Sequence, residues 1–295
     1  MLRVPAFWIE KEVFWPDRQE QAGRKQAVIL MNCTGRGLAD YLLSNVQFRQ
    51  KFNLDRLETA PILIREHQGM PIVATDTFHE ILNQADLLIT NNTGDRHGNL
   101  ALNQILTHLN DRCAVITCVA TNFGAFSPIA HGYGGLIGVH AMLDAGAQRN
   151  DVWKALKNGS FDSYFNIRWR LEMGRMADRD RFHDVGFANF ILEHHRTTKL
   201  FMAQAHPAGS MVAYIGCRIL ELLGLPHDSI DKVLAYDCLQ FSVRGQPETQ
   251  FEFKHYGFKY PMRFTDGFDE FYGHLLDLAV ESWRLGGFMP PAYDG

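Results

Sequence analysis

The chain has 295 residues, of which 46% are hydrophobic and 21% are charged, and its formal net charge at pH 7 is −4. This length and apolar content suit one large α/β domain or two closely packed ones. The negative charge and the scattered Lys and Arg residues argue against a general nucleic-acid-binding surface. The five cysteines show no regular spacing, which indicates reduced thiols and a cytoplasmic protein rather than a disulfide framework.

Residues 1–26 are rich in aromatic side chains and then in polar ones. The aromatic residues Phe7, Trp8, Phe14 and Trp15 are expected to pack as an arm on the main body. Pro and charged residues interrupt this segment, so we expect neither a secretory signal nor a membrane anchor there. No other segment reaches the roughly 20 apolar residues that span a bilayer.

The stretch Ala27–Leu43 reads as a strand, a turn and a helix. Ala27–Met31 is a short apolar run with Val and Ile, which predicts a buried strand. Small residues fill the turn Asn32–Gly37, and Leu38–Leu43 carries leucines at helical spacing. Cys33 is therefore expected where a strand ends and a helix begins.

A thiol at the first turn of a helix faces unpaired backbone N–H groups and a partial positive charge. That field stabilises the thiolate, lowers the pKa of the thiol and raises its nucleophilicity. The same N–H groups can hold an oxyanion or a phosphate. The alternative is that Cys33 is a small buried apolar residue, as most free cysteines are.

Further strands and helices alternate along the next part of the chain, which predicts a parallel sheet with helices on its faces. The expected strands are Pro61–Ile64, Ala85–Thr90 and Cys113–Cys118, and the expected helices are Thr75–Gln84 and Asn99–Leu109. Ligands of such sheets sit outside the carboxyl ends of the strands. Three loops should converge there, namely Asn32–Gly37, Asn91–Asn99 and Ala120–Gly135.

The loop Asn91–Asn99 combines turn-forming residues with two side chains of functional type. Arg96 can hold a phosphate or carboxylate with two hydrogen bonds, and His97 can move protons. Turn chemistry alone would also explain this loop. The loop Ala120–Gly135 places aromatic side chains among glycines, a composition typical of functional loops.

The second half of the chain is expected to be mostly helical. The predicted helices are Ile137–Ala145, Asp151–Leu156, Ile167–Met176, Asp184–His195, Met211–Leu223 and Thr265–Arg284, the last with Phe268, Phe271, Leu275, Leu278 and Trp283 facing inward. A short strand is expected at Lys199–Met202. His206 then lies between a strand end and a helix start, as Cys33 does, so both junctions should point to the same side. A structural role for this lone histidine is the alternative.

The Asn32-Cys33 turn after a first strand, followed by a Leu-rich helix, resembles the opening of the WcbI-type polysaccharide-biosynthesis family of proposed acetyltransferases. Members typically begin with a strand, Gly-Asn-Cys-Gln and a helix with spaced leucines. Met31 stands here in place of the Gly, and Thr34 in place of the Gln.

A second correspondence begins at Lys199-Leu200-Phe201 and continues through His206-Pro207 into the helix with Arg218-Ile219-Leu220 and Leu223-Gly224. The family shows a similar order: Leu-Phe, then Asn-His-Pro, then a helix that ends in Arg-Ile-Leu and Leu-Gly. This chain has Ala205 before His206 where the family has Asn. A weaker match is the strand at Ala85–Ile89 with its polar loop, where the family often has Gln-Pro in place of Asn91-Asn92.

The resemblance covers about residues 27–225. It implies an SGNH- or Rossmann-like three-layer α/β core, a parallel sheet flanked by helices, with a mostly helical C-terminal half. The implied division is an arm at 1–26, a catalytic core at 27–225 and an extension at 226–295 packed on the core. The implied activity is O-acetylation of a sugar in capsular or related polysaccharide biosynthesis. Acetyl-coenzyme A would be the co-substrate, and no metal is implied.

Acyl transfer needs a nucleophile or base, donors for the tetrahedral oxyanion and a hold on the phosphates of the carrier. The candidates for catalysis are Cys33 and His206. The candidates for oxyanion or substrate binding are Asn32, Thr34, Gly35, Asn91, Asn92 and His97, and those for the coenzyme phosphates are Arg36 and Arg96. No acidic residue directly precedes His206, so either Asp95 completes a triad or the pair acts as a dyad.

Two other functions fit the same residues. The chain also resembles serine esterases that carry Gly-Asp-Ser at this turn, with Cys33 in place of the serine. Alternatively, Thr34–Gly37 only cradles a phosphate in a non-catalytic module that binds coenzyme A or a nucleotide-sugar, although its glycine spacing matches no phosphate-binding motif. A metal site from His97, His131 and His206 is disfavoured, because they lack ligand spacing.

Overall fold

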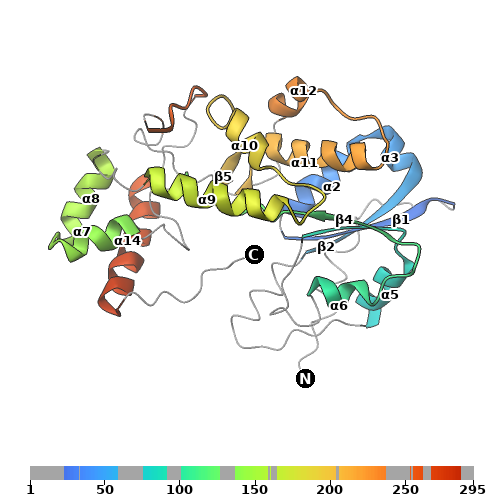
Figure 1. Ribbon diagram of the computed structural model, residues 1–295, viewed down its shortest axis with the longest axis horizontal. Helices are drawn as coiled ribbons and strands as arrows, with labels where there is room; N and C mark the ends of the chain where they lie inside the picture. Colours follow the sequence, from blue (N-terminus) through green and yellow to red (C-terminus); the bar gives the residue numbers. More distant parts are fainter. Residues whose placement is uncertain are drawn as a thin grey trace.

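The computed structural model describes residues 23–32, 34–58, 76–91, 101–126, 137–158, 160, 165–203, 206–236, 253, 255–261 and 267–286. Its centre is a parallel sheet of four strands in the order β2-β1-β3-β4 (Figure 1). The strands are β1 (Lys25–Met31), β2 (Phe52–Glu58), β3 (Leu87–Asn91) and β4 (Ala114–Cys118).

The register places the carboxyl ends of all four strands at one edge. Met31 pairs with Glu58, and Asn91 pairs with Cys118. Beyond β4, Val185 extends the sheet by a single parallel bridge to Cys118. The Val119 N–H donates to the Val185 carbonyl, and the Val185 N–H donates to the Thr117 carbonyl, each at 3.0 Å.

Helices cover both faces of the sheet (Figure 1). On one face lie α2 (Thr34–Ser44), α3 (Val46–Lys51) and α11 (Gly209–Leu222), with α12 (Ile230–Ala235) packed on α11. On the other lie α5 (Asp76–Gln84) and α6 (Leu102–Leu106). The confirmed fold class is therefore α/β with a parallel sheet between helical layers.

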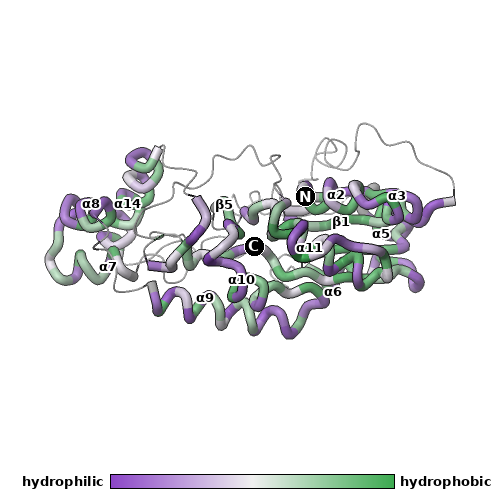
Figure 2. The backbone as a smooth tube through the Cα atoms, turned by 90° about the horizontal axis from the view of Figure 1, so that it is seen from above, coloured by the Kyte–Doolittle hydropathy of each residue, from purple (hydrophilic) through white to green (hydrophobic). Residues whose placement is uncertain are grey.

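The strand β1 is buried on both sides because its alternate side chains enter two different cores. Ala27, Ile29 and Met31 pack in the cluster that includes α2 and α11. Val28 and Leu30 pack in the cluster that includes α5 and α6. Figure 2 shows the sheet and α11 as the most hydrophobic part of the described chain.

The C-terminal half is mostly helical, as expected. It contains α7 (Ile137–Asp144), α8 (Arg149–Asn158), α9 (Phe165–Asp180), α10 (Ala188–His194) and α14 (Phe268–Arg284). The helices α7, α8 and α14 share their own core with Tyr256. Phe126 and Trp169 pack against this core and also against the core of the sheet. A short antiparallel pair, β5 (Phe201–Ala203) and β6 (His206–Pro207), precedes α11.

Two expected helix starts were wrong, and one strand was not predicted. The helix after β1 begins at Thr34 rather than Leu38, so the glycine-containing turn forms its first turn. β2 was not predicted, because polar residues interrupt its apolar positions, while the strand expected at Pro61–Ile64 lies outside the described residues. The segment expected to begin a helix at Asp184 is extended up to Phe187, because Val185 bonds to the sheet.

The buried face of α14 also differs from the predicted one. Tyr272 and Leu276 are fully buried, whereas Phe271 is 37% and Leu278 is 40% exposed. Trp283, also predicted inward, is 36% exposed and donates its indole N–H to Asp144 at 2.8 Å. Of the predicted inward residues Leu275 is buried, and Phe268 packs partly buried against the same core.

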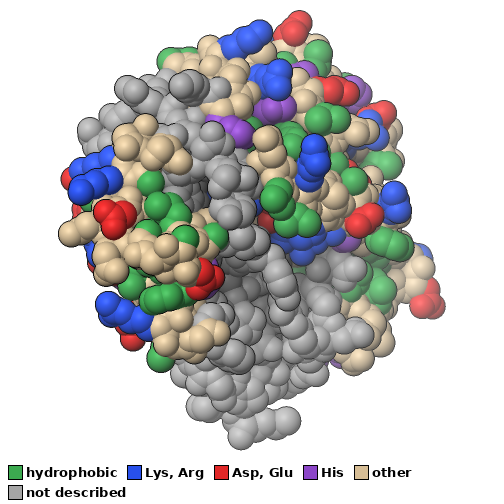
Figure 3. All heavy atoms as spheres, turned by 60° about the vertical axis from the view of Figure 1, so that its left-hand side comes forward, with side chains coloured by type: hydrophobic (Ala, Val, Ile, Leu, Met, Phe, Trp, Pro, Cys, Tyr) green, Lys and Arg blue, Asp and Glu red, His purple; other side chains and the backbone are tan. Residues whose placement is uncertain are grey.

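No helix among the described residues is both long and apolar enough to cross a lipid bilayer. On the face shown in Figure 3, described side chains of both charge signs are interspersed.

Candidate active site

The carboxyl end of β1 leads into α2 through a turn built on Asn32. The side-chain oxygen of Asn32 accepts a hydrogen bond from the Thr34 N–H at 3.1 Å, which caps the helix. The Asn32 carbonyl accepts from the Gly35 N–H at 2.8 Å. The Gly35 N–H, a predicted oxyanion donor, is thus engaged within the turn.

Gly35 lets the helix start directly against the strand. A Cβ atom added at Gly35 would lie 3.1 Å from Cγ2 of Ile29 and 3.2 Å from Cβ of Met31. Both distances are shorter than ordinary van der Waals contact, so a larger residue would push α2 away from β1.

Asn91 ties together three strand ends. Its side-chain oxygen accepts from the Asn32 N–H at 3.4 Å, and its amide donates to the Cys118 carbonyl at 3.2 Å. The side chain is only 6% exposed. Asn91, predicted as an oxyanion donor, therefore holds the turn through its side-chain oxygen and β4 through one N–H of its amide, which carries a second N–H.

A buried pair of hydroxyl groups joins this turn to the segment after β4. The hydroxyl oxygens of Thr34 and Thr121 are 2.6 Å apart, and both side chains are fully buried. Sequence analysis did not find Thr121, because a hydroxyl pair that joins positions 87 residues apart leaves no local pattern.

His206 lies in β6, where it pairs with Ala203 and is partly buried. Burial lowers the pKa of its imidazole, because desolvation disfavours the charged form. The imidazole is therefore neutral at pH 7 and able to accept a proton.

The helices α2 and α11 run side by side and parallel. A Cβ added at Gly216 would lie 2.2 Å from Cδ1 of Tyr41, so the ring of Tyr41 rests directly on the α11 backbone. At the far end, the Asn45 amide donates to the Pro226 carbonyl at 2.8 Å. The contact positions advance in the same direction along both segments, from Tyr41 to Asn45 and from Gly216 to Pro226, so the two helices run in the same direction. The structure thereby brings His206, just before α11, to the end where the Asn32 turn begins α2.

A buried polar network holds this helix pair together. The Tyr41 hydroxyl donates to the Asp228 carboxylate at 2.8 Å. The Cys217 sulfur lies 2.9 Å from the Tyr41 hydroxyl oxygen, and its thiol donates to the Asp228 carbonyl at 3.8 Å. Burial raises the pKa of both Tyr41 and Cys217, so both stay protonated.

Three charged side chains of α9 hold the segment after β4 in place. Arg168 donates to the Gly124 carbonyl, Arg175 donates to Glu172, and Arg175 also donates to the Asn122 carbonyl at 2.8 Å. Glu172 accepts from the Gly124 N–H at 3.4 Å. Sequence analysis treated this helix only as a helix, although Arg and Glu at i, i+4 and i+7 share one face.

Of the remaining predicted site residues, Arg36 is described and is exposed on the first turn of α2. Burial raises the pKa of the nearby Asp40 carboxyl, and the positive charges of Arg36 and Arg56 oppose that rise. Four lie outside the described residues, namely Cys33, Asn92, Arg96 and His97. Cys33 follows Asn32 and precedes Thr34 in sequence, so both neighbours belong to the strand-to-helix turn.

The described residues contain no group of three or more His, Cys, Asp or Glu side chains that could bind a metal ion. His97 and His131 lie outside that part of the chain.

Comparison with known proteins identifies the family. The family model described as polysaccharide biosynthesis enzyme WcbI matches residues 26–228. A search of curated proteins gives no match. One solved structure matches with 13% sequence identity and a TM-score of 0.53, covering 88% of this chain and 99% of the other. It is described as WcbI, a novel polysaccharide biosynthesis enzyme, in its native form without a disulfide bond between coenzyme A and one of its cysteines.

The structural match supports the fold, and the family match extends from β1 to the end of the α2–α11 pair. This chain belongs to the WcbI polysaccharide biosynthesis enzyme family.

Proposed function

We propose that this protein is a coenzyme-A-dependent acyltransferase that acetylates a sugar hydroxyl during the synthesis of a capsular or related polysaccharide. The observation that carries the proposal is the parallel packing of α2 and α11, because it supports a shared site for the Asn32 turn and His206. Membership in a polysaccharide biosynthesis family supports a sugar acceptor.

The chemistry of the turn fits a coenzyme thioester. Coenzyme A, when bound, supplies the acyl group as a thioester. The exposed guanidinium of Arg36, on the first turn of α2, is placed to hold a phosphate near the positive end of the helix. Arg96 is the second candidate for the phosphates. The buried hydrogen bonds from Thr34 to Thr121 and from Asn91 to the Cys118 carbonyl hold the turn in position.

In this proposal Cys33 is the nucleophile and His206 is the base. The neutral His206 imidazole takes the proton of the Cys33 thiol, the thiolate attacks the acyl carbonyl, and His206 returns the proton to the sulfur of coenzyme A, which leaves as a thiol. In the second half, the neutral His206 takes the proton of the sugar hydroxyl, the sugar oxygen displaces the Cys33 thiolate from the acyl group, and His206 returns the proton to Cys33. Asn92, His97 and the second N–H of Asn91 are the candidates for oxyanion and acceptor contacts.

A cytoplasmic location belongs to the same proposal. The described cysteines Cys113, Cys118 and Cys217 are all free thiols, and burial raises the pKa of each. Free thiols of this kind suit a reducing compartment.

The test is mass spectrometry of the protein after incubation with acetyl-coenzyme A and no acceptor. We expect one acetyl group on Cys33 of the wild type, none at that position in Cys33→Ser, and slower acetylation in His206→Gln. Hydroxylamine should remove the group, because it cleaves thioesters.

Hydrolysis of an aryl acetate without coenzyme A serves as the second measurement. If the wild type hydrolyses the ester quickly and takes no acetyl group from acetyl-coenzyme A, the esterase function replaces the transferase. If neither reaction occurs, Cys33 is not an acyl acceptor and the proposed mechanism fails.

A further inference from the structure

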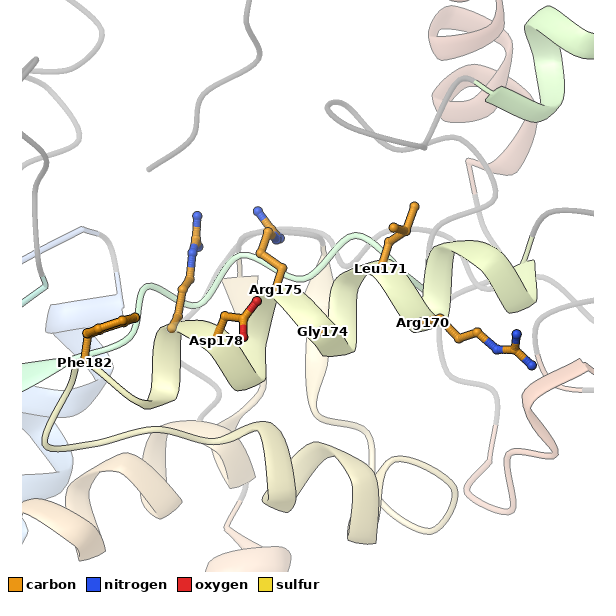
Figure 4. Close-up of a pocket in the computed structure, with 7 residues that line it drawn as sticks. Arg170, Leu171, Gly174, Arg175, Asp178 and Phe182 are labelled. Carbon is orange, nitrogen blue, oxygen red and sulfur yellow. The ribbon is translucent and has the colours of Figure 1, made fainter.

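A groove runs along α9, beside the face that contacts Gly124. Its volume is about 530 Å³, and the described residues that line it are Arg170, Leu171, Gly174, Arg175, Asp178, Arg179 and Phe182. Figure 4 shows Leu171 and Arg175 on one side of the helix, with Arg170 pointing away from them. Neither the catalytic proposal nor the packing of the core uses this groove.

The positive charges of the groove are spread along its length. At 100° per residue, Arg170 lies on one flank, while Arg175 and Arg179 lie one turn apart on the other. From Arg170 to Arg179 the helix rises about 14 Å, nine residues at 1.5 Å each. The groove therefore presents separated single charges rather than one dense cluster.

Arg170 is the arginine best placed to take a ligand. It is exposed and, among the residues that the structure describes, no carboxylate lies within ion-pair distance of it. Arg175, by contrast, is already bonded to Glu172 and to the Asn122 carbonyl.

Between the arginines, the groove offers apolar and hydroxyl-accepting surface. Leu171 is 56% and Phe182 is 78% exposed, so both offer apolar surface to a ligand. The floor at Gly174 is open, since an added Cβ would meet nothing within 4 Å. Asp178 beside it can accept hydrogen bonds from hydroxyl groups.

The groove is connected to the candidate active site through a single segment of chain. Arg175 lines the groove and donates to the Asn122 carbonyl. Asn122 follows Thr121, whose hydroxyl contacts Thr34 at the start of α2. The groove and the Asn32 turn are therefore joined by adjacent residues of one segment.

We infer that this groove binds an acidic saccharide, which is the acceptor chain of the proposed acetylation and so rests on that function. Carboxylates spaced along a sugar chain match the separated arginines, while the apolar faces of sugar rings match Leu171 and Phe182. Sugar hydroxyls match Asp178. The clustered phosphates of coenzyme A match less well, because Arg170 stands apart from the other arginines of the groove.

The test is calorimetric titration of the full-length protein with tetragalacturonate at low salt, with its fully methyl-esterified form as the neutral comparison. We expect wild type to bind the acid and not the ester, and binding to weaken as salt is added. Arg170→Gln should weaken binding about tenfold, and Phe182→Ala should weaken it severalfold. Both side chains are exposed, so neither change should unfold the protein.

The matched control is Arg284→Gln, an exposed arginine on α14 that should leave saccharide affinity unchanged. The saccharide inference is overturned if wild type does not bind tetragalacturonate or binds the ester equally well. It is also overturned if Arg284→Gln weakens binding as much as Arg170→Gln does. Coenzyme A is titrated into the same variants. If Arg170→Gln weakens the binding of coenzyme A, the groove binds the carrier instead of the saccharide. Failure of wild type to bind coenzyme A would instead contradict the proposed acyl donor, whatever the saccharide result.

Discussion

His206 and His195 are histidines whose burial favours the neutral imidazole. His195 is 8% exposed, its Nδ1–H donates to the Ile191 carbonyl at 3.0 Å, and its ring packs on Trp169. Burial lowers the pKa of both histidines below 6.5. The unfolded chain therefore binds more protons than the folded chain at pH values just below 6.5.

This difference predicts that the contribution of these histidines to the free energy of unfolding decreases as the pH falls below about 6.5 and is constant from there to about pH 8. The measurement is urea unfolding of wild type and His195→Gln at steps from about pH 8 to about pH 5. His195→Gln should be less stable at every pH, but its stability should fall less steeply below pH 6.5. Equal slopes for both proteins would show that the buried His195 does not titrate in this range.

Glu172 is 9% exposed, is paired with Arg175 and accepts a hydrogen bond from the Gly124 N–H. Glu172→Gln removes the negative charge and leaves the Arg175 guanidinium without this partner, so it should cost about 3 kcal/mol of unfolding free energy. Denaturant unfolding measures the loss. Glu281→Gln, at a side chain 61% exposed, is the control and should change stability by less than about 0.5 kcal/mol. A similar small loss in both variants would contradict the role of Glu172.

At the scale of elements, the α2–α11 pair depends on a glycine. The Tyr41 ring cannot move away from Gly216, because Asp228 and Cys217 hold its hydroxyl. Gly216→Ala should therefore destabilise the protein by about 1–3 kcal/mol. Gly174→Ala is the matched control, since nothing lies within 4 Å of the added Cβ, and it should stabilise α9 by up to about 1 kcal/mol. Thermal unfolding separates the two outcomes, and equal effects would disprove the close packing.

The buried face of α14 gives a prediction of the same kind. Leu276 is fully buried and Leu278 is 40% exposed. Leu276→Ala should cost about 2–5 kcal/mol because it leaves a cavity, whereas Leu278→Ala should cost less than about 1 kcal/mol. Denaturant unfolding measures the free energy of unfolding of both variants. A larger loss of stability in Leu278→Ala would support the buried face predicted from sequence.

The elements that sequence patterns predicted correctly have strong local signals. β1 and β3 are continuous apolar runs, and their burial on both faces explains those runs. β2 has weaker apolar character, and only its pairing with β1 makes it a strand. The face of α14 was predicted from spacing alone, and several spacings of apolar residues fit one helix. The choice among them depends on α7 and α8, which lie far away in sequence.

At the scale of the whole molecule, the sequence predicted that two strand-to-helix junctions share one side. The prediction assumed one sheet, but His206 lies in the separate antiparallel pair β5–β6, and only the parallel α2–α11 pair relates it to the carboxyl end of β1. The contacts that stabilise the site could not be predicted. Thr121 meets Thr34 across 87 positions, and α9 clamps a loop more than 40 positions away, so both depend on the folded chain.

The central claim is that the turn at the start of α2 holds a coenzyme A carrier for acyl transfer. Its most direct test is calorimetric titration of coenzyme A into wild type, Arg36→Ala and Arg49→Ala. Arg36 and Arg49 are both exposed, but Arg49 lies on α3, away from the turn. We predict dissociation constants on the order of micromolar for wild type and Arg49→Ala, and about tenfold weaker binding for Arg36→Ala. No binding to wild type, or equal binding to all three proteins, would contradict the placement of the carrier at this turn.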